Sequence, residues 1–196
     1  MPSAKVQAAN GLLVTDVQDT LGTRIPVADN EPMRGTYTAF VSGDVPATSA
    51  TDILTITGSA TKLIRIRSLI ISGTATSASN IQLLFYRRTT ANTGGTFTNP
   101  TLIRRDANDD APTATLTLYS ANPASLGTTL GVADGARLNV APAANGSIDR
   151  VFLQYGWIND KAPVLRGVLD SFCIGLGGVG PPAGCNLDFN LCISEE

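Results

Sequence analysis

The chain has 196 residues, of which only 15% are charged, and its formal net charge is −2. This length suits one domain with a terminal arm, and the charge gives no electrostatic case for binding nucleic acid or a membrane surface. The sequence contains no histidine, which excludes the serine–histidine–aspartate triad, imidazole zinc sites and histidine general bases within the chain.

Residues 1–34 are predicted to form an extended N-terminal arm or linker. Thr15 as N-cap and Gly22 as stop indicate one short helix, and a Pro- and Asp-rich stretch follows it. No apolar run follows Lys5, so the sequence predicts neither a signal peptide nor a membrane span. We expect the chain to be made in a cytoplasm.

Residues 35–196 are predicted to form one all-β domain, because Thr, Val and Ile recur in short runs between turn signals. This pattern is typical of an antiparallel β-sandwich or a barrel. The strands are expected at Thr36–Ser42, Ile53–Thr57, Lys62–Ser72, Asn80–Arg88, Leu102–Arg105, Thr113–Tyr119, Arg137–Val140, Ile148–Trp157, Val164–Leu176 and Asn186–Ser194.

Side chains on a strand alternate between its two faces, which orients some of these strands. In the run that begins at Lys62, the buried face is predicted to hold Ile64, Ile66 and Ile70, and the other face Arg65 and Arg67. In the last strand, the buried face is predicted to hold Leu187, Phe189, Leu191 and Ile193.

The end of the chain is predicted to be a long-looped hairpin, with GGVGPPAG between its strands. The three cysteines are Cys173, Cys185 and Cys192, and an odd number leaves at least one unpaired within the chain. Cys173 and Cys185 flank the loop and are candidates for a disulfide, with Cys192 on the polar face as the odd thiol. The alternative is three buried, inert thiols.

Motifs for catalysis or metal binding are weak. Asp106, Asp109 and Asp110 suggest a calcium loop, but their spacing lacks the D-x-D-x-D-G pattern and suits an exposed turn. The segment GLGGVG matches a dinucleotide fingerprint, but two prolines follow where a helix should open. We therefore predict no catalytic, cofactor-binding or metal-binding residue, no cofactor, and no enzymatic activity.

Paired arginines are the predicted contact residues. Arginine makes bidentate contacts with carboxylates, so neighbouring strands that carry these pairs would form a patch for an acidic partner or a second subunit. The alternative is a solvated strand face. The six candidates are Arg65, Arg67, Arg87, Arg88, Arg104 and Arg105. The aromatic residues Phe152, Tyr155 and Trp157 are interpreted as core, with a sugar-binding role as the alternative.

The segments ATDILTITGSATK, RRTTANTGGT and ATLTLYSANPASLGT, within Pro46–Gly131, resemble a family of virion-associated structural proteins of tailed bacteriophages. The likeness extends to APVLRGVLDSFCIGLGG and to the terminal Glu195–Glu196. The resemblance implies a structural component from the head or tail genes and no catalytic residues. The first 45 residues and Cys192 depart from it.

From this resemblance we expect a β-sandwich of jelly-roll type in the virion, assembled in the host cytoplasm. The expected role is decoration or cementing of the capsid through inter-subunit contacts. The partners would be the major capsid protein or other virion proteins, and further copies of the chain, without nucleic acid or membrane. The alternative is a receptor-binding adhesin at the tail or a fibre.

Overall fold

The computed structural model describes residues 7–9, 12–14, 34–145, 149–156 and 161–196. The chain divides into two units, Met1–Arg34 and Gly35–Glu196. In the first unit, β1 (Gln7–Ala9) pairs antiparallel with β2 (Leu12–Val14). The short helix predicted between Thr15 and Gly22 lies outside the described residues.

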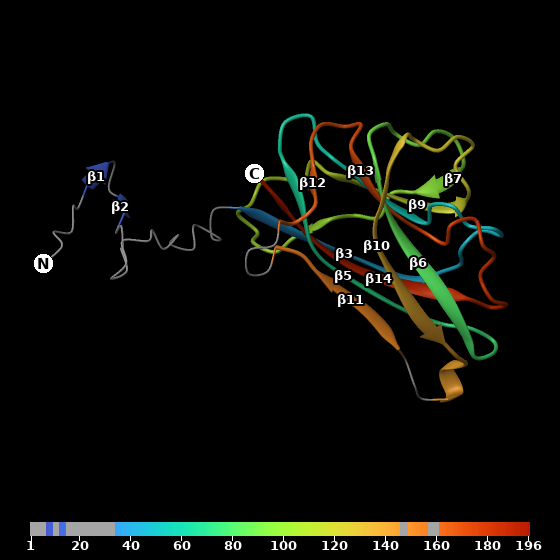
Figure 1. Cartoon of the computed structure of the whole chain (residues 1–196). Helices are drawn as coiled ribbons and strands as arrows, with labels where there is room; N and C mark the ends of the chain where they lie inside the picture. Colours follow the sequence, from blue (N-terminus) through green and yellow to red (C-terminus); the bar gives the residue numbers. More distant parts are fainter. Residues whose placement is uncertain (1–6, 10–11, 15–33, 146–148, 157–160) are drawn as a thin grey trace, which may run out of the picture. The chain divides into compact units, whose positions relative to one another are not determined.

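The second unit is built from strands, which confirms the prediction of an all-β fold (Figure 1). A 3-10 turn, η2 (Ala143–Asn145), is the helical element in its described part. The strands are β3 (Gly35–Asp44), β4 (Leu54–Thr57), β5 (Ile64–Thr74), β6 (Ser79–Arg88), β7 (Thr96–Thr98), β8 (Ile103–Arg104), β9 (Thr115–Ala121), β10 (Thr129–Val140), β11 (Arg150–Gln154), β12 (Val164–Leu165), β13 (Ser171–Gly175) and β14 (Asn186–Glu195).

These strands form two antiparallel sheets. Sheet A has the order β11-β5-β14-β3-β8, with β12 also paired to β5, and sheet B has the order β10-β6-β13-β4-β9-β7. Strands β3, β14, β5 and β11 run side by side in Figure 1. Buried side chains from both sheets join in one hydrophobic core, as in a β-sandwich.

The pairing of the strands follows a single rule. The first long strand pairs with the last (β3 with β14), and inward along the chain β4 pairs with β13, β5 with β11, and β6 with β10. Two further pairs, β5 with β14 and β6 with β13, join these strands into two sheets, and β8, β9, β7 and β12 extend the sheets. Along the chain, the strands of the first four pairs alternate between the two sheets, except that β6 and β10 both lie in sheet B.

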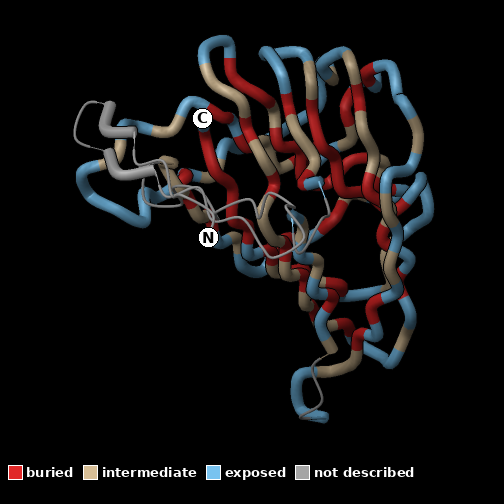
Figure 2. Tube along the Cα trace, turned by 60° about the vertical axis from the view of Figure 1, so that its left-hand side comes forward, coloured by how far each residue is buried: buried red, intermediate tan, exposed pale blue. Residues whose placement is uncertain are grey.

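Buried positions occur along strands of both sheets (Figure 2), and large apolar residues occupy many of them. Tyr37 on β3, Phe85 on β6, Phe172 on β13 and Phe189 on β14 are almost fully buried. Burial of each such side chain stabilises the fold by about 1.5–3 kcal/mol. The buried face predicted for the last strand is confirmed, since all four of its apolar side chains are buried.

One face assignment was wrong. Ile70 is half-buried, whereas Leu69 and Ile71 are buried. The register between β14 and β5 shifts between Cys192–Ser68 and Ile193–Ile66, so β5 has an extra residue at this point. A β-bulge reverses the alternation beyond it, and this places Ile70 on the outer face of sheet A.

The predicted terminal hairpin was also wrong. The run Val164–Leu176 forms two strands, β12 in sheet A and β13 in sheet B, separated by a turn in which Gly167 has φ +74°. Strand β14 then returns to sheet A. The GGVGPPAG segment therefore crosses from one sheet to the other and does not join paired strands.

The prediction from sequence missed strand β7 and made strand β10 too short. Strand β7 follows Gly94–Gly95, and all of its residues are exposed. A prediction that relies on one buried and one exposed face therefore does not detect it. Strand β10 begins at Thr129 and not at Arg137. Register shifts interrupt its early part, where Gly131 has φ +138°, and such irregularity hides the alternation that predicts a strand.

Candidate interaction surface

The outer face of sheet A carries a row of side chains that crosses its strands. Phe152 on β11 pairs with Ile70 on β5, Ile70 pairs with Asn190 on β14, and Asn190 pairs with Phe40 on β3. Ile103 on the edge strand β8 pairs with Thr38, two residues from Phe40, and so lies on the same face. We call these five residues (Phe40, Ile70, Ile103, Phe152 and Asn190) the outer row.

The outer row is open to solvent although most of its members are apolar. Phe40 is 67% exposed, Ile103 59% and Phe152 55%. The strand neighbours of Phe40 and Phe152 are buried or half-buried on the core side, so the alternation of these strands directs both side chains outward. Large apolar groups that gather on one exposed face are typical of a protein–protein contact.

The dimensions of this face suit an interface. The strands of sheet A, β11, β5, β14, β3 and β8, have 5, 11, 10, 10 and 2 residues, and each residue covers about 4.8 Å by about 3.3 Å of the sheet. The total area, on the order of 600 Å², approaches the roughly 800 Å² per partner of a standard interface. The central polar positions of this face hold Thr38, Ser68 and Asn190, which can be desolvated at lower cost than charges.

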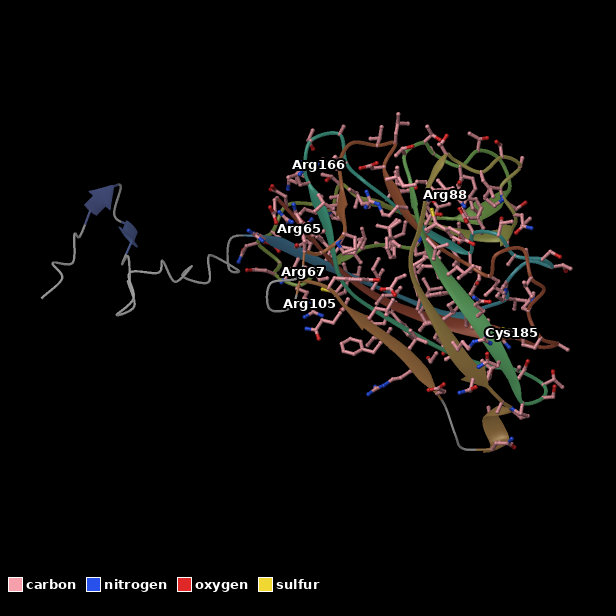
Figure 3. All side chains as sticks on the ribbon, in the orientation of Figure 1. Arg65, Arg67, Arg88, Arg105, Arg166 and Cys185 are labelled. Carbon is pink, nitrogen blue, oxygen red and sulfur yellow. The ribbon has the colours of Figure 1, made fainter. Side chains whose placement is uncertain are left out.

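Arginines flank the outer row at one end of the domain. Arg65 and Arg67 lie on the outer face of β5, and Arg105 donates its backbone N–H to Thr36 O of β3 at 2.8 Å. Figure 3 shows these three residues and Arg166 at the same end of the domain. Arg65 makes a bidentate pair with Glu196, with 3.2 Å between Nη2 and Oε2. We call this the basic end of the domain; it also holds the carboxylates of Asp109 and Glu196, so it offers charge contacts beside an apolar centre.

The six arginines predicted from sequence do not form one patch. Arg104 is exposed on β8 and donates to Ala107 O at 3.4 Å. Arg87 and Arg88 belong to sheet B, where Arg87 is half-buried and Arg88 is buried. Arg87 lies 3.5 Å from Asp170 Oδ2, and burial lowers the pKa of its guanidinium. These two residues serve the fold and not a surface.

Arg88 is the centre of a buried polar network that the sequence did not indicate. Its Nε and Nη2 donate to the two oxygens of Asp52 at 2.9 and 2.7 Å, and its Nη1 donates to Gly127 O at 2.9 Å. Asn92 donates to Asp52 Oδ2 at 2.7 Å and accepts from Gly127 N. Because a paired buried charge is costly to break, this network fixes the loops that follow β6 and β9.

The C-terminal residues are part of the structure. Glu195 is buried and accepts hydrogen bonds from the backbone and hydroxyl of Thr113 and from Ala114 N, at 2.8–3.1 Å. Glu196 exchanges backbone hydrogen bonds with Leu63 at 2.9 and 3.0 Å. The terminal acidic pair therefore anchors the segment before β9 and the start of β5.

All three thiols are free and buried. Cys173 lies in sheet B between Thr55 and Tyr86, whereas Cys185 lies at the opposite end of the domain from the arginines, as Figure 3 shows. Cys192 is on the outer side of β14 but is covered. Burial raises the pKa values of Cys173 and Cys185 to about 11, which leaves little thiolate near neutral pH. The predicted Cys173–Cys185 disulfide is absent from this structure.

The other candidate motifs have structural partners. Asp109 accepts from Thr36 N, Asp110 pairs with Lys62 at 3.2 Å, and Asp106 accepts from Asn108 N, so the three carboxylates do not converge. Within the described ranges, no cluster of metal-binding side chains occurs, and no helix is long and apolar enough to cross a membrane.

The three aromatic candidates do not share one environment. Phe152 belongs to the outer row. Tyr155 is half-buried, packs edge-on against Phe172 at a centroid distance of 6.1 Å and donates to Asp134 Oδ2 at 3.3 Å, which supports its interpretation as core. Trp157 lies outside the described residues.

Comparison with known proteins assigns neither a family nor a function to the chain. No protein-family model matches the chain, and no curated protein sequence matches it.

Proposed function

We propose that this chain is a structural protein of a tailed-bacteriophage particle that decorates or cements the capsid and binds its neighbours through the outer face of sheet A. The observation that carries the proposal is the outer row, an exposed apolar stripe that spans paired strands of one sheet. The partner is the major capsid protein or another virion protein, with further copies of the chain beside it. The chain acts in the virion, after assembly in the host cytoplasm, and not as an enzyme.

The strand order supports a jelly-roll form of the sandwich. When a long hairpin with four strand pairs is folded over, one sheet takes the first, eighth, third and sixth strands, and the other takes the second, seventh, fourth and fifth. Counting β3, β4, β5, β6, β10, β11, β13 and β14 as these eight gives the observed sheet orders. Jelly rolls are common in viral capsid domains, in agreement with the sequence resemblance.

The basic end of the domain supports contact with an acidic neighbour. Arg105 and Arg166 are exposed, and in the described part of the chain no carboxylate pairs with either. Arginine binds carboxylates in a fixed bidentate geometry. Charges at the rim of an apolar contact fix its register and orientation.

Removal of the protein from the particle tests the proposed role. Phage particles made without this chain should release their genome at a lower temperature, or after a smaller osmotic shock, than particles that contain it. Addition of the purified protein should restore the original stability. Particles that are equally stable with and without the protein would exclude the cement function.

A further inference from the structure

A second candidate site lies on the other sheet. The connection between β13 and β14 runs beside the outer face of β6 and β10 and encloses a cavity of about 300 Å³. Its polar lining comes from Ser79, Asn80, Gln82 and Arg137, and its apolar rim from Val179 and Pro182. This volume is at the lower limit for ligand pockets in proteins, so it suits a small molecule or a single unit of a larger one.

The polar side chains of this cavity are held in place by the sheet. Gln82 pairs with Arg137 across the strands, and Asn80 pairs with Asn139. Arg137 Nη1 donates to Asn80 Oδ1 at 2.8 Å, Asn80 Nδ2 donates to Asn139 Oδ1 at 2.9 Å, and Asn139 Nδ2 donates to Asp149 Oδ2 at 3.1 Å. This chain of hydrogen bonds fixes the guanidinium before any ligand arrives, which lowers the entropic cost of binding.

The charge of the cavity favours a ligand with one negative charge. Arg137 is exposed, and no carboxylate forms an ion pair with it within the described ranges. Four of its five N–H donors remain after the bond to Asn80, and a guanidinium with free donors binds a carboxylate in a bidentate manner.

The rest of the lining favours a sugar ring. The amides of Asn80 and Gln82 donate and accept hydrogen bonds, as recognition of hydroxyl groups requires. Val179 and Pro182 provide an apolar wall against which the C–H face of a pyranose packs. We infer that this cavity binds an acidic sugar, a uronate-type unit whose carboxylate contacts Arg137 and whose hydroxyls contact Asn80 and Gln82.

This inference does not depend on the proposed capsid contact, because the cavity is in sheet B and the outer row is in sheet A. It gives the particle a means to hold acidic polysaccharide while sheet A is occupied. The cavity and the outer row can therefore be tested separately.

The test is an NMR titration of the full chain at neutral pH with D-glucuronate, and in parallel with D-glucose and with acetate. We expect glucuronate to shift the amide signals of residues 79–82, 137 and 179–180 saturably, with at least tenfold weaker binding of glucose and of acetate. Absence of these shifts would overturn the inference. Equal affinity for acetate and glucuronate would overturn the assignment to a sugar.

Variants locate the site. Arg137→Gln removes the charge and should weaken glucuronate binding at least tenfold. Gly180→Trp adds a large side chain to the lining of the cavity and should obstruct it, and the change should be tolerated because a Cβ at Gly180 meets no atom within 4 Å. Arg166→Gln, which changes an exposed arginine at the basic end, is the matched control and should bind as the native chain does. Unchanged affinity in Arg137→Gln or Gly180→Trp, in a protein whose spectrum remains dispersed, would contradict the proposed contacts.

Discussion

At the scale of single residues, the buried polar groups decide how the domain responds to mutation and pH. Asp52, Arg88 and Glu195 are buried with hydrogen-bond partners, whereas Asp44 Oδ2 is buried and has no hydrogen-bond partner within the described part of the chain. A satisfied buried group stabilises its surroundings, and an unsatisfied one destabilises the fold. The two kinds of residue therefore lead to opposite predictions.

Glu195→Gln should destabilise the domain by about 2–3 kcal/mol. The change keeps the side-chain volume but places an amide N–H against backbone N–H donors at Thr113 and Ala114. Denaturation in urea at neutral pH measures the loss. The control is Glu196→Gln, which alters the partly exposed ion pair with Arg65 and should cost less than about 1 kcal/mol. Equal losses in both variants would contradict the role assigned to Glu195.

Asp44→Asn should stabilise the protein at pH 8 but not at pH 4. Burial raises the pKa of Asp44 from 3.8 to about 6. Because the folded pKa lies above the unfolded one, native stability falls as the pH rises from 3.8 through about 6. The full effect is about 3 kcal/mol. The melting temperatures of the native protein and the variant should converge as the pH falls across this range. A constant difference between them would be evidence against a raised pKa of Asp44.

At the scale of elements, the bulge in β5 determines which side chains reach the outer face. Before the bulge Ile64 and Ile66 face the core, and after it Leu69 and Ile71 do, so that Ile70 points outward. Without the extra residue, Ile70 would be buried and Ile71 exposed. The outer row depends on this local irregularity.

A pair of aspartate substitutions tests the bulge. Ile71→Asp places a charge in the core and should prevent folding or destabilise the domain by more than about 4 kcal/mol. Ile70→Asp is on the half-buried outer face and should change stability by less than about 1 kcal/mol. Circular dichroism during thermal unfolding distinguishes the two. If Ile70→Asp were the more damaging change, the register between β5 and β14 beyond the bulge would be incorrect.

The sequence predicts local features of this fold better than distant pairings. Alternation identified the buried face of β14, because no irregularity interrupts the stretch from Phe189 to Ile193 on that strand. It failed at β5 and β10, where bulges change the period. It also gave no sign that Arg88 meets Asp52, since these residues are 36 positions apart. The outer row joins five separate strands and becomes visible only once their registers are known.

At the scale of the whole molecule, the two sheets present different surfaces. Sheet A presents the outer row with arginines at one end, and both Gly35 and Glu195 lie at that end, paired with each other. The junction with residues 1–34 is therefore next to the C-terminus and the basic residues. Sheet B carries the polar cavity near Arg137. The domain can contact a neighbour with one sheet and leave the other free.

The most direct test of the proposed contact is co-sedimentation of the purified protein with particles that lack it. The native chain should bind saturably, and the double variant Phe40→Asp/Phe152→Asp should bind at least tenfold more weakly, because it places charges in the outer row. Leu130→Asp, at an exposed apolar position on β10, is the control and should bind as the native chain does. Binding of the double variant with native affinity would contradict the assignment of sheet A as the contact surface.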